Sequence, residues 1–257
     1  MSKCRVESDE RFMSSLAYIV ERMEQCEGVR IRKTSTKKRG AVEITLTTEE
    51  GESQIEARNI LFDAISDIIV TDCKSHYILE NMRLPVRDLF DRHVFLCALC
   101  EFDREMDKYL VLESLEVGEV FLLDSFYDFR LGNLKKRWDE ICLIANENIE
   151  NLVVEGNFFE LLRYLISNLE QRTEEVFLEC IGDTVTAYDR QMRPIEGIYT
   201  NRNLKSCQRA ISILVATNPR RILFWGEENE FFEKVRQLFT GVEYVEIAEG
   251  KEKTLAQ

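Results

Sequence analysis

A histidine and two cysteines are spaced so that one helical face would present all three to a metal ion. His93, Cys97 and Cys100 fall at i, i+4 and i+7. Zinc is bound by imidazole and thiolate groups, usually four of them in a tetrahedral arrangement. The fourth ligand would have to come from another helix, and the candidates are Cys73, His76 and Cys142.

The same helical face is also where a core contact belongs. His93, Cys97 and Cys100 continue an apolar stripe that includes Phe90 and Val94. A single Cys-x-x-Cys pair inside an apolar helix usually serves as two small hydrophobic residues, and the sequence has no second pair at ligand spacing. We therefore expect no metal and no other cofactor, and His93, Cys97 and Cys100 remain weak candidates.

A second group of residues is strongly basic. Six positive charges stand within ten residues of a predicted β-hairpin: Arg30, Arg32, Lys33, Lys37, Lys38 and Arg39. A two-stranded ribbon fits the major groove of DNA, where such charges would contact phosphates. An acidic partner protein, or the surplus of carboxylates in the chain itself, would suit these residues equally. Charges at a hairpin also discourage edge pairing, and no aromatic residue is interleaved for base stacking.

Carboxylates gather ahead of a predicted helix. Asp124 and Asp128 precede that helix, together with Arg130. A catalytic acid and base would need one raised and one ordinary pKa in a shared pocket, and spacing alone does not establish this. We expect Arg130 to form a partly buried ion pair with Asp124, Asp128 or Glu160, which gives this group a structural role.

Motifs for nucleotide binding and for hydrolysis are absent from the sequence. It contains neither Gly-x-x-x-x-Gly-Lys-Ser/Thr nor Gly-x-Gly-x-x-Gly, and no Gly-x-Ser-x-Gly elbow. The loop Gly226–Asn229 follows a predicted strand, where an α/β sheet would hold a ligand. Glu227 and Glu228 in this loop would repel phosphate, and acidic residues there also complement a helix dipole. An enzyme is therefore less favoured than a binding protein.

The composition is that of an acidic globular protein. The 257 residues carry a net charge of −13, and 45% of them are apolar, which is typical of a folded chain. Most of such a surface would repel nucleic acid and anionic lipid. Eight scattered cysteines, an N-terminus without an apolar leader and the lack of a membrane-length apolar run favour a cytoplasmic protein with free thiols.

The hydrophobic patterns predict an α+β fold with a largely helical middle flanked by small mixed α/β segments at both ends. Segment 1–52 combines a helix with a hairpin, region 53–172 has helical periodicity, and segment 173–257 returns to mixed structure. The two mixed ends could form one compact unit and share one sheet. Within the middle region, one long helix is expected from Val86 to about Leu112.

The last part of the chain has the pattern of a crossover. An apolar strand over Arg221–Trp225 is followed by a helix over Phe231–Phe239 and a strand over Val242–Ile247. A strand, a helix and a strand in such a short stretch predict a βαβ unit with two parallel strands.

Two phrases in the second half of the chain resemble a known family. Ser125-Phe-Tyr-Asp-Phe-Arg-Leu-Gly-Asn-Leu134 is similar to the phrase Gly-Phe-Ile-x-Phe-Arg-Leu-Lys-Asp-Tyr, and Phe158-Phe-Glu-Leu-Leu-Arg-Tyr-Leu-Ile166 to Phe-Ile-x-Leu-Leu-Lys-Tyr-Phe-Val. Over residues 124–225 the chain therefore resembles a divergent member of the YtxC-like sporulation proteins of endospore-forming bacteria. The best-matching positions, which we expect to be structural, are Phe129, Arg130, Leu131, Leu161, Leu162 and Tyr164.

This resemblance implies a role in endospore formation and supplies no catalytic residues. Together with the missing catalytic motifs, it leads us to expect a non-catalytic interaction or scaffold protein with a protein partner. The alternative is a nucleic-acid-binding protein that uses the hairpin Arg30–Arg39. A small-molecule or metal-dependent enzyme is the third hypothesis.

Overall fold

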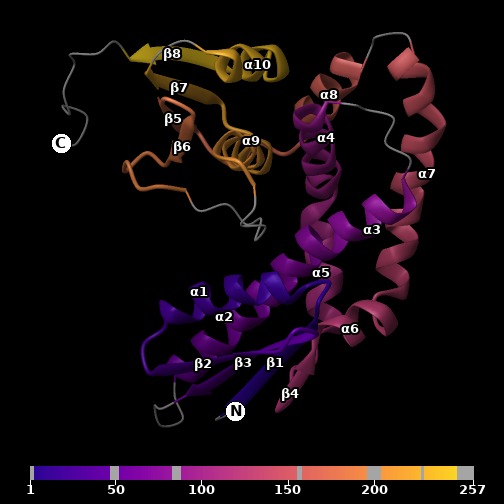
Figure 1. Ribbon diagram of the computed structural model, residues 1–257, viewed down its shortest axis with the longest axis vertical. Helices are drawn as coiled ribbons and strands as arrows, with labels where there is room; N and C mark the ends of the chain where they lie inside the picture. Colours follow the sequence, from indigo (N-terminus) through magenta and orange to yellow (C-terminus); the bar gives the residue numbers. More distant parts are fainter. Residues whose placement is uncertain are drawn as a thin grey trace. The chain divides into compact units, whose positions relative to one another are not determined.

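The computed structural model describes residues 3–46, 52–82, 88–154, 158–195, 204–226 and 229–247. They form two compact units (Figure 1). Unit 1 contains the described residues of 3–81 and 103–142, and unit 2 contains those of 82–102, 143–195 and 204–247. Each unit combines helices with a four-stranded sheet of mixed direction, which confirms the predicted α+β class.

Unit 1 is built on a sheet with the strand order β2-β3-β1-β4. Both β2 and β1 pair with β3 in antiparallel fashion, and β4 pairs with β1 in parallel. Helices α1 and α2 lie over one face of this sheet (Figure 1). The elements are β1 (Lys3–Asp9), η1 (Met13–Ser15), α1 (Leu16–Glu24), β2 (Val29–Ser35), β3 (Arg39–Leu46), α2 (Glu52–Ile68), the π-helix η2 (Ile69–Cys73), α3 (Lys74–Asn81), α5 (Arg104–Ser114), β4 (Val120–Leu122), α6 (Leu123–Phe129) and the first part of α7 (Gly132–Val154).

Strand alternation gives the first sheet a buried face and a charged face. Side chains of successive strand residues point to opposite sides, so Val6 of β1 and Val42 and Ile44 of β3 face the helices and are buried. The residues between them form the opposite surface. This charged face consists of Lys3, Arg5, Glu7, Asp9, Arg30, Arg32, Thr34, Arg39, Glu43 and Thr45.

Unit 2 contains a sheet with the strand order β6-β5-β7-β8. Strands β5 and β6 form an antiparallel hairpin, and β7 pairs in parallel with both β5 and β8. The predicted βαβ crossover is therefore confirmed. The elements are α4 (Leu89–Glu101), the second part of α7, α8 (Phe158–Ser167), β5 (Glu175–Ile181), β6 (Thr184–Tyr188), α9 (Ser206–Thr217), β7 (Arg221–Gly226), α10 (Glu230–Leu238) and β8 (Glu243–Ile247).

The prediction of one long helix from Val86 to about Leu112 is wrong. Helix α4 ends at Glu101 and α5 begins at Arg104. Asp103 between them has φ 55, in the left-handed region, and one such residue interrupts a right-handed helix. Residues 83–87, which include Pro85, lie outside the described part of the chain.

The compact units do not follow the order of the sequence segments. Region 53–172 contributes to both units, and its strand β4 joins the sheet of segment 1–52. The described part of segment 173–257 has a sheet of its own in unit 2. Within the residues that the structure describes, the two mixed ends therefore do not share a sheet. Among the helices of the described residues, none has the length and apolar character that a membrane span requires.

Candidate functional site

The basic residues of the hairpin lie on the edge strand β2 (Arg30, Arg32, Lys33), in the adjoining turn (Lys37, Lys38) and at the start of β3 (Arg39). Strand β2 is the outermost strand, and the turn that links it to β3 is closed by a hydrogen bond from Thr36 N–H to the Arg39 carbonyl oxygen at 2.7 Å. All six predicted side chains are exposed. Arg39 differs from the others because it forms an ion pair with Asp124 at 3.0 Å and lies 3.9 Å from Glu7.

The other five cations form what we call the basic row, which consists of Arg30, Arg32, Lys33, Lys37 and Lys38. None of them forms an ion pair or a side-chain hydrogen bond within the described part of the chain. Within the described residues, no carboxylate therefore neutralises these charges through an ion pair. Five of the six basic residues that the sequence analysis named are therefore without an ion pair among the described residues.

Carboxylates occupy the charged face next to the basic row. Arg5 of β1 donates to Glu7 at 2.6 Å and to Glu43 at 3.0 Å. Glu43 stands directly opposite Arg32 in the β2–β3 register, without an ion pair between the two. The charged face is therefore mixed in sign away from the edge, and only the edge itself is uniformly positive.

The predicted metal face is used for a contact between helices α4 and α9. His93 Nε2 lies 2.7 Å from Ser212 Oγ and 3.1 Å from the Gln208 carbonyl oxygen. Cys97 Sγ lies 3.6 Å from the same nitrogen and 3.4 Å from Ser212 Oγ. Burial lowers the pKa of His93, so the imidazole is neutral near pH 7. Cys100 is fully buried on the same helix.

A metal ion has no ligand set in the described residues. No group of three or more His, Cys, Asp or Glu side chains there has a suitable geometry. The candidates for a fourth ligand, Cys73, His76 and Cys142, belong to unit 1, whereas His93 belongs to unit 2. Burial raises the pKa of Cys142 to about 11, which keeps its thiol protonated and disfavours metal binding.

The acidic group before α7 is held by arginines other than the expected one. Asp124 accepts a hydrogen bond from Arg39, and Asp128 accepts two from Arg11 at 3.0 and 2.8 Å. The hydrogen bonds from Arg11 lower the pKa of Asp128. Arg130 is exposed, and the expected ion pair between Arg130 and these carboxylates is wrong. Each of these two carboxylates is therefore bound by an arginine, rather than paired with the other as an acid and a base.

A buried charge network in unit 1 was not anticipated. The fully buried Lys74 donates to Asp107 at 2.7 Å, and Asp107 also accepts from Trp138 Nε1 at 3.0 Å. One helical turn earlier on α5, Arg104 donates to Asp67 at 2.8 Å. The α2–α3 segment thus supplies an acid and a base, and α5 supplies the complementary base and acid.

Further hydrogen bonds complete this network. Asp67 also accepts from Lys108 at 3.0 Å and from the Tyr18 hydroxyl at 3.1 Å. The charges are therefore used for holding helices together rather than for chemistry on a ligand. The π-helix η2 lies between the two partners on the α2–α3 segment. This network could have been found in the sequence from charged residues that interrupt apolar helical stripes, such as Asp67 next to Ile68.

The six family-motif residues lie in different environments. Leu131 and Leu162 are buried, and Leu161 is half-buried. Phe129 is 82% exposed and Tyr164 is 65% exposed, while Arg130 is also on the surface. A structural role for all six stays a prediction.

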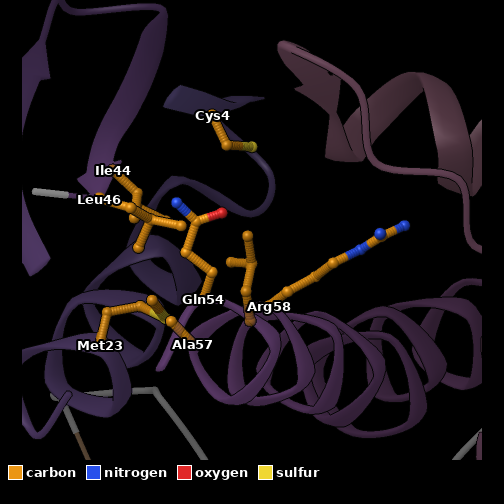
Figure 2. Close-up of a pocket in the computed structure, with 8 residues that line it drawn as sticks. Cys4, Met23, Ile44, Leu46, Gln54, Ala57 and Arg58 are labelled. Carbon is orange, nitrogen blue, oxygen red and sulfur yellow. The ribbon is translucent and has the colours of Figure 1, made fainter. Parts of the chain in front are cut away.

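Figure 2 shows a small apolar cavity in unit 1, between the sheet and helices α1 and α2. Its volume of about 30 Å³ is enough for a water molecule or two rather than for a substrate. Burial raises the pKa of Cys4, at its wall, to about 11, so this thiol is not an activated nucleophile. The lining residues are Cys4, Met23, Ile44, Leu46, Gln54, Ala57, Arg58 and Leu61.

The predicted ligand loop of unit 2 is described only at its ends. Asn229 caps α10 by accepting a hydrogen bond from Phe232 N–H at 3.0 Å. Gly226 has φ +118, and a Cβ atom there would lie 2.4 Å from the Cys180 carbonyl oxygen. Glycine is therefore required for the close approach of two strands. Glu227 and Glu228 lie outside the described residues.

Comparisons with known proteins do not assign the chain to a group. No protein-family model, no curated protein and no solved structure matches it. The resemblance of residues 124–225 to the YtxC-like sporulation proteins stays a prediction. The function is therefore inferred from the geometry of the basic row.

Proposed function

We propose that this protein is a non-catalytic interaction or scaffold protein that binds an acidic partner protein through the basic row. The observation that carries the proposal is that five exposed cations, on β2 and in the turn that follows it, have no ion-pairing partner in the described part of the chain. Elsewhere in the same unit, Arg5, Arg11 and Arg39 are each bound to carboxylates. An excess of 13 negative charges in the whole chain makes this unpaired edge notable.

The state of the other candidate groups supports a non-catalytic role. His93 and Cys97 contact a neighbouring helix, and Asp124 and Asp128 are held by arginines. These groups are engaged in contacts that stabilise the fold. The cellular setting, the cytoplasm of a sporulating bacterium, is proposed on the family resemblance and on the eight free cysteines.

A protein is favoured over nucleic acid as the partner. A DNA-binding ribbon would lay β2 and β3 against phosphates, but β3 presents Glu43 and its neighbour β1 presents Glu7 on the same face. These carboxylates would repel a phosphate backbone that crosses the face. Strand β3 is also paired on both sides, so the hairpin does not protrude as a free ribbon.

The experiment is a quantitative capture of partners by the tagged full-length chain from sporulating cells, with and without nuclease. It compares the natural sequence with the triple variant Arg30→Gln, Arg32→Gln and Lys33→Gln. We expect a protein partner that survives nuclease treatment and is lost from the variant, because the variant removes three charges that the partner must neutralise.

A matched control removes the same number of charges elsewhere. Arg92, Lys136 and Arg190 are exposed, and their replacement by glutamine should leave the partner bound. Equal loss in both triple variants would contradict a specific role of the basic row. Capture that disappears with nuclease in the natural sequence would instead establish the nucleic-acid alternative.

A further inference from the structure

The outer side of β2 has no strand beside it in the described structure. Its inner side pairs with β3 along all seven residues, and β2 is the last strand in the order of the sheet. The bond between Thr36 and Arg39 fixes the alternation of this antiparallel ladder. It follows that the backbone N–H and C=O groups of residues 29, 31, 33 and 35 are directed away from β3, toward the open edge.

The side chains of β2 divide into two kinds along this edge. Arg30 and Arg32 lie on the charged face and are exposed. Val29 and Ile31 lie on the opposite side, where they are half-buried and pack against the core of unit 1. A strand placed beside β2 would therefore meet Arg30 and Arg32 on one of its faces. On the other face it would meet Val29 and Ile31, followed by the exposed Lys33.

We propose that β2 binds an extended segment of the partner as an additional strand, and that this segment alternates acidic and apolar residues. The proposal rests on the proposed function, which it makes more specific. Residues two apart in a strand are separated by about 6.6–6.8 Å. Acidic residues with this period lie beside Arg30 and Arg32, and the apolar residue between them lies beside Ile31. Backbone hydrogen bonds to the edge supply further affinity.

The basic row also decides against a second copy of this chain as the added strand. Two β2 strands paired with each other would bring Arg30, Arg32 and Lys33 close to the same cations of the other copy. Like charges on neighbouring strands destabilise the pairing, and cations on an edge strand are a known barrier to self-association. The same charges attract an acidic strand.

The test uses synthetic seven-residue peptides, the length of β2, with both ends capped. One peptide alternates Glu and Val, and the other has the same composition with all Glu residues before the Val residues. Binding to the full-length chain is measured by fluorescence anisotropy. We expect the alternating peptide to bind about tenfold or more tightly than the block peptide, because only the former presents both kinds of side chain in register.

Backbone methylation separates strand addition from simple charge attraction. In an added strand, only every second amide N–H faces β2. Methylation of one alternate set of amide nitrogens should abolish binding, and methylation of the other set should leave it unchanged. The protein itself is unaltered in this comparison, so a loss cannot come from misfolding.

Charge variants connect the peptide to the basic row. The double variant Arg30→Gln and Arg32→Gln should weaken binding of the alternating peptide about tenfold or more, since two charge-assisted contacts are removed. The double variant Arg92→Gln and Arg190→Gln removes the same charge from other exposed sites and should bind as the natural sequence does.

The outcomes distinguish this inference from the proposed function. Equal affinity for the alternating and block peptides, lost in the double variant Arg30→Gln and Arg32→Gln, would overturn strand addition and keep the acidic-partner function. Absence of any peptide binding, while partner capture still depends on the basic row, would likewise overturn only strand addition. Capture that depends on nucleic acid, with duplex DNA preferred to both peptides, would overturn both.

Discussion

The two compact units resemble each other in their sheets and differ in how they use positive charge. Each sheet has four strands of mixed direction. In unit 2, Arg221 of β7 donates to Glu175 of β5 at 2.9 Å and forms an ion pair with Glu243 of β8 at 3.0 Å. One cation thus connects three strands. In unit 1, Arg30 and Arg32 stand on the charged face of β2, and within the described residues neither side chain forms an ion pair with another strand.

This difference separates charges that hold the fold from charges that are available to a partner. An exposed ion pair gains little in water, and an unpaired exposed cation loses little by having no partner. A row of five cations adds mutual repulsion, however, and no ion pair among the described residues offsets it. The basic row therefore has no structural explanation of the kind that applies to Arg221. This is the physical reason for assigning it to binding.

Two interior contacts, one in each unit, also differ in charge. Unit 1 buries the charged pair Lys74 and Asp107 between helices. The contact between α4 and α9 in unit 2 uses the neutral groups of His93 and Ser212 instead. Removal of the Lys74 charge should therefore lower the free energy of unfolding strongly. A change of pH should alter the free energy of unfolding through His93.

The largest decrease in the free energy of unfolding is expected from Lys74→Met. This change leaves Asp107 buried without its main counter-charge, which typically costs about 3–5 kcal/mol. Urea unfolding followed by tryptophan fluorescence measures the loss. Trp138 is buried in unit 1 and Trp225 belongs to unit 2, so a Trp225→Phe background reports on unit 1 alone.

The control for this measurement is Lys136→Met, at an exposed lysine on α7. It should change the free energy of unfolding by no more than about 0.5 kcal/mol. Similar losses in the two variants would show that the Lys74 pair does not hold the helices of unit 1 together. A loss seen only in Lys74→Met would confirm that unit 1 depends on buried charge.

The next effect is a pH dependence that comes from His93. Burial lowers its pKa in the folded chain, whereas the unfolded value is about 6.5. Below pH 6.5 the unfolded chain takes up a proton that the folded chain binds less well. The free energy of unfolding should therefore fall as the pH drops from about 6.5 to the folded pKa, by at most about 1.4 kcal/mol per pH unit.

The histidine variants isolate this contribution. In His93→Gln the side-chain amide can still donate toward Ser212, but it does not titrate. The free energy of unfolding should therefore fall less below pH 6.5 than in the natural sequence, because the uptake of one proton by the unfolded chain is removed. His76 is the other histidine of the chain, and His76→Gln serves as the control for the loss of an imidazole outside the α4–α9 contact. Identical pH profiles for the natural sequence and His93→Gln would remove the assigned role of the imidazole.

Much of the sheet structure could be predicted from local patterns. The hairpin β2–β3 and the crossover β7–α10–β8 follow from alternating or continuous apolar runs bounded by turn residues. Strand β4 was missed because three residues are too short to show a period. Its place beside β1 depends on a pairing across more than a hundred residues of sequence. The helix break at Asp103 was missed because neither Gly nor Pro marks it.

The candidate site could be predicted only in part, for a similar reason. The six basic positions are evident from composition, yet their pairing is a matter of tertiary structure. Arg39 is bound by Asp124, which lies 85 residues away, whereas Arg30 and Arg32 have no such partner among the described residues. The buried network was missed because a charged residue within a helix usually faces water. Sequence spacing does not reveal that Asp67 and Arg104 meet.

The smallest expected effects are changes in the urea midpoint when one arginine of each sheet is replaced, and they compare the two sheets directly. Arg221→Gln breaks the links from β7 to Glu175 and Glu243 and should lower the urea midpoint slightly. Arg32→Gln breaks no contact in the described structure and relieves repulsion from Arg30, so the midpoint should stay the same or rise. Both are measured on the full-length chain under identical low-salt conditions, because salt screens exposed charges.

An equal decrease in both variants would mean that Arg32 stabilises the fold as Arg221 does, and the distinction between the sheets would be lost. A decrease in Arg221→Gln alone, combined with loss of the acidic peptide in Arg30→Gln and Arg32→Gln, gives the opposite conclusion. The cations of β2 would then matter for binding while being dispensable for folding. A partner-binding edge requires that combination. If these cations also stabilised the fold, their substitution would lower binding and stability together, and the two effects could not be told apart.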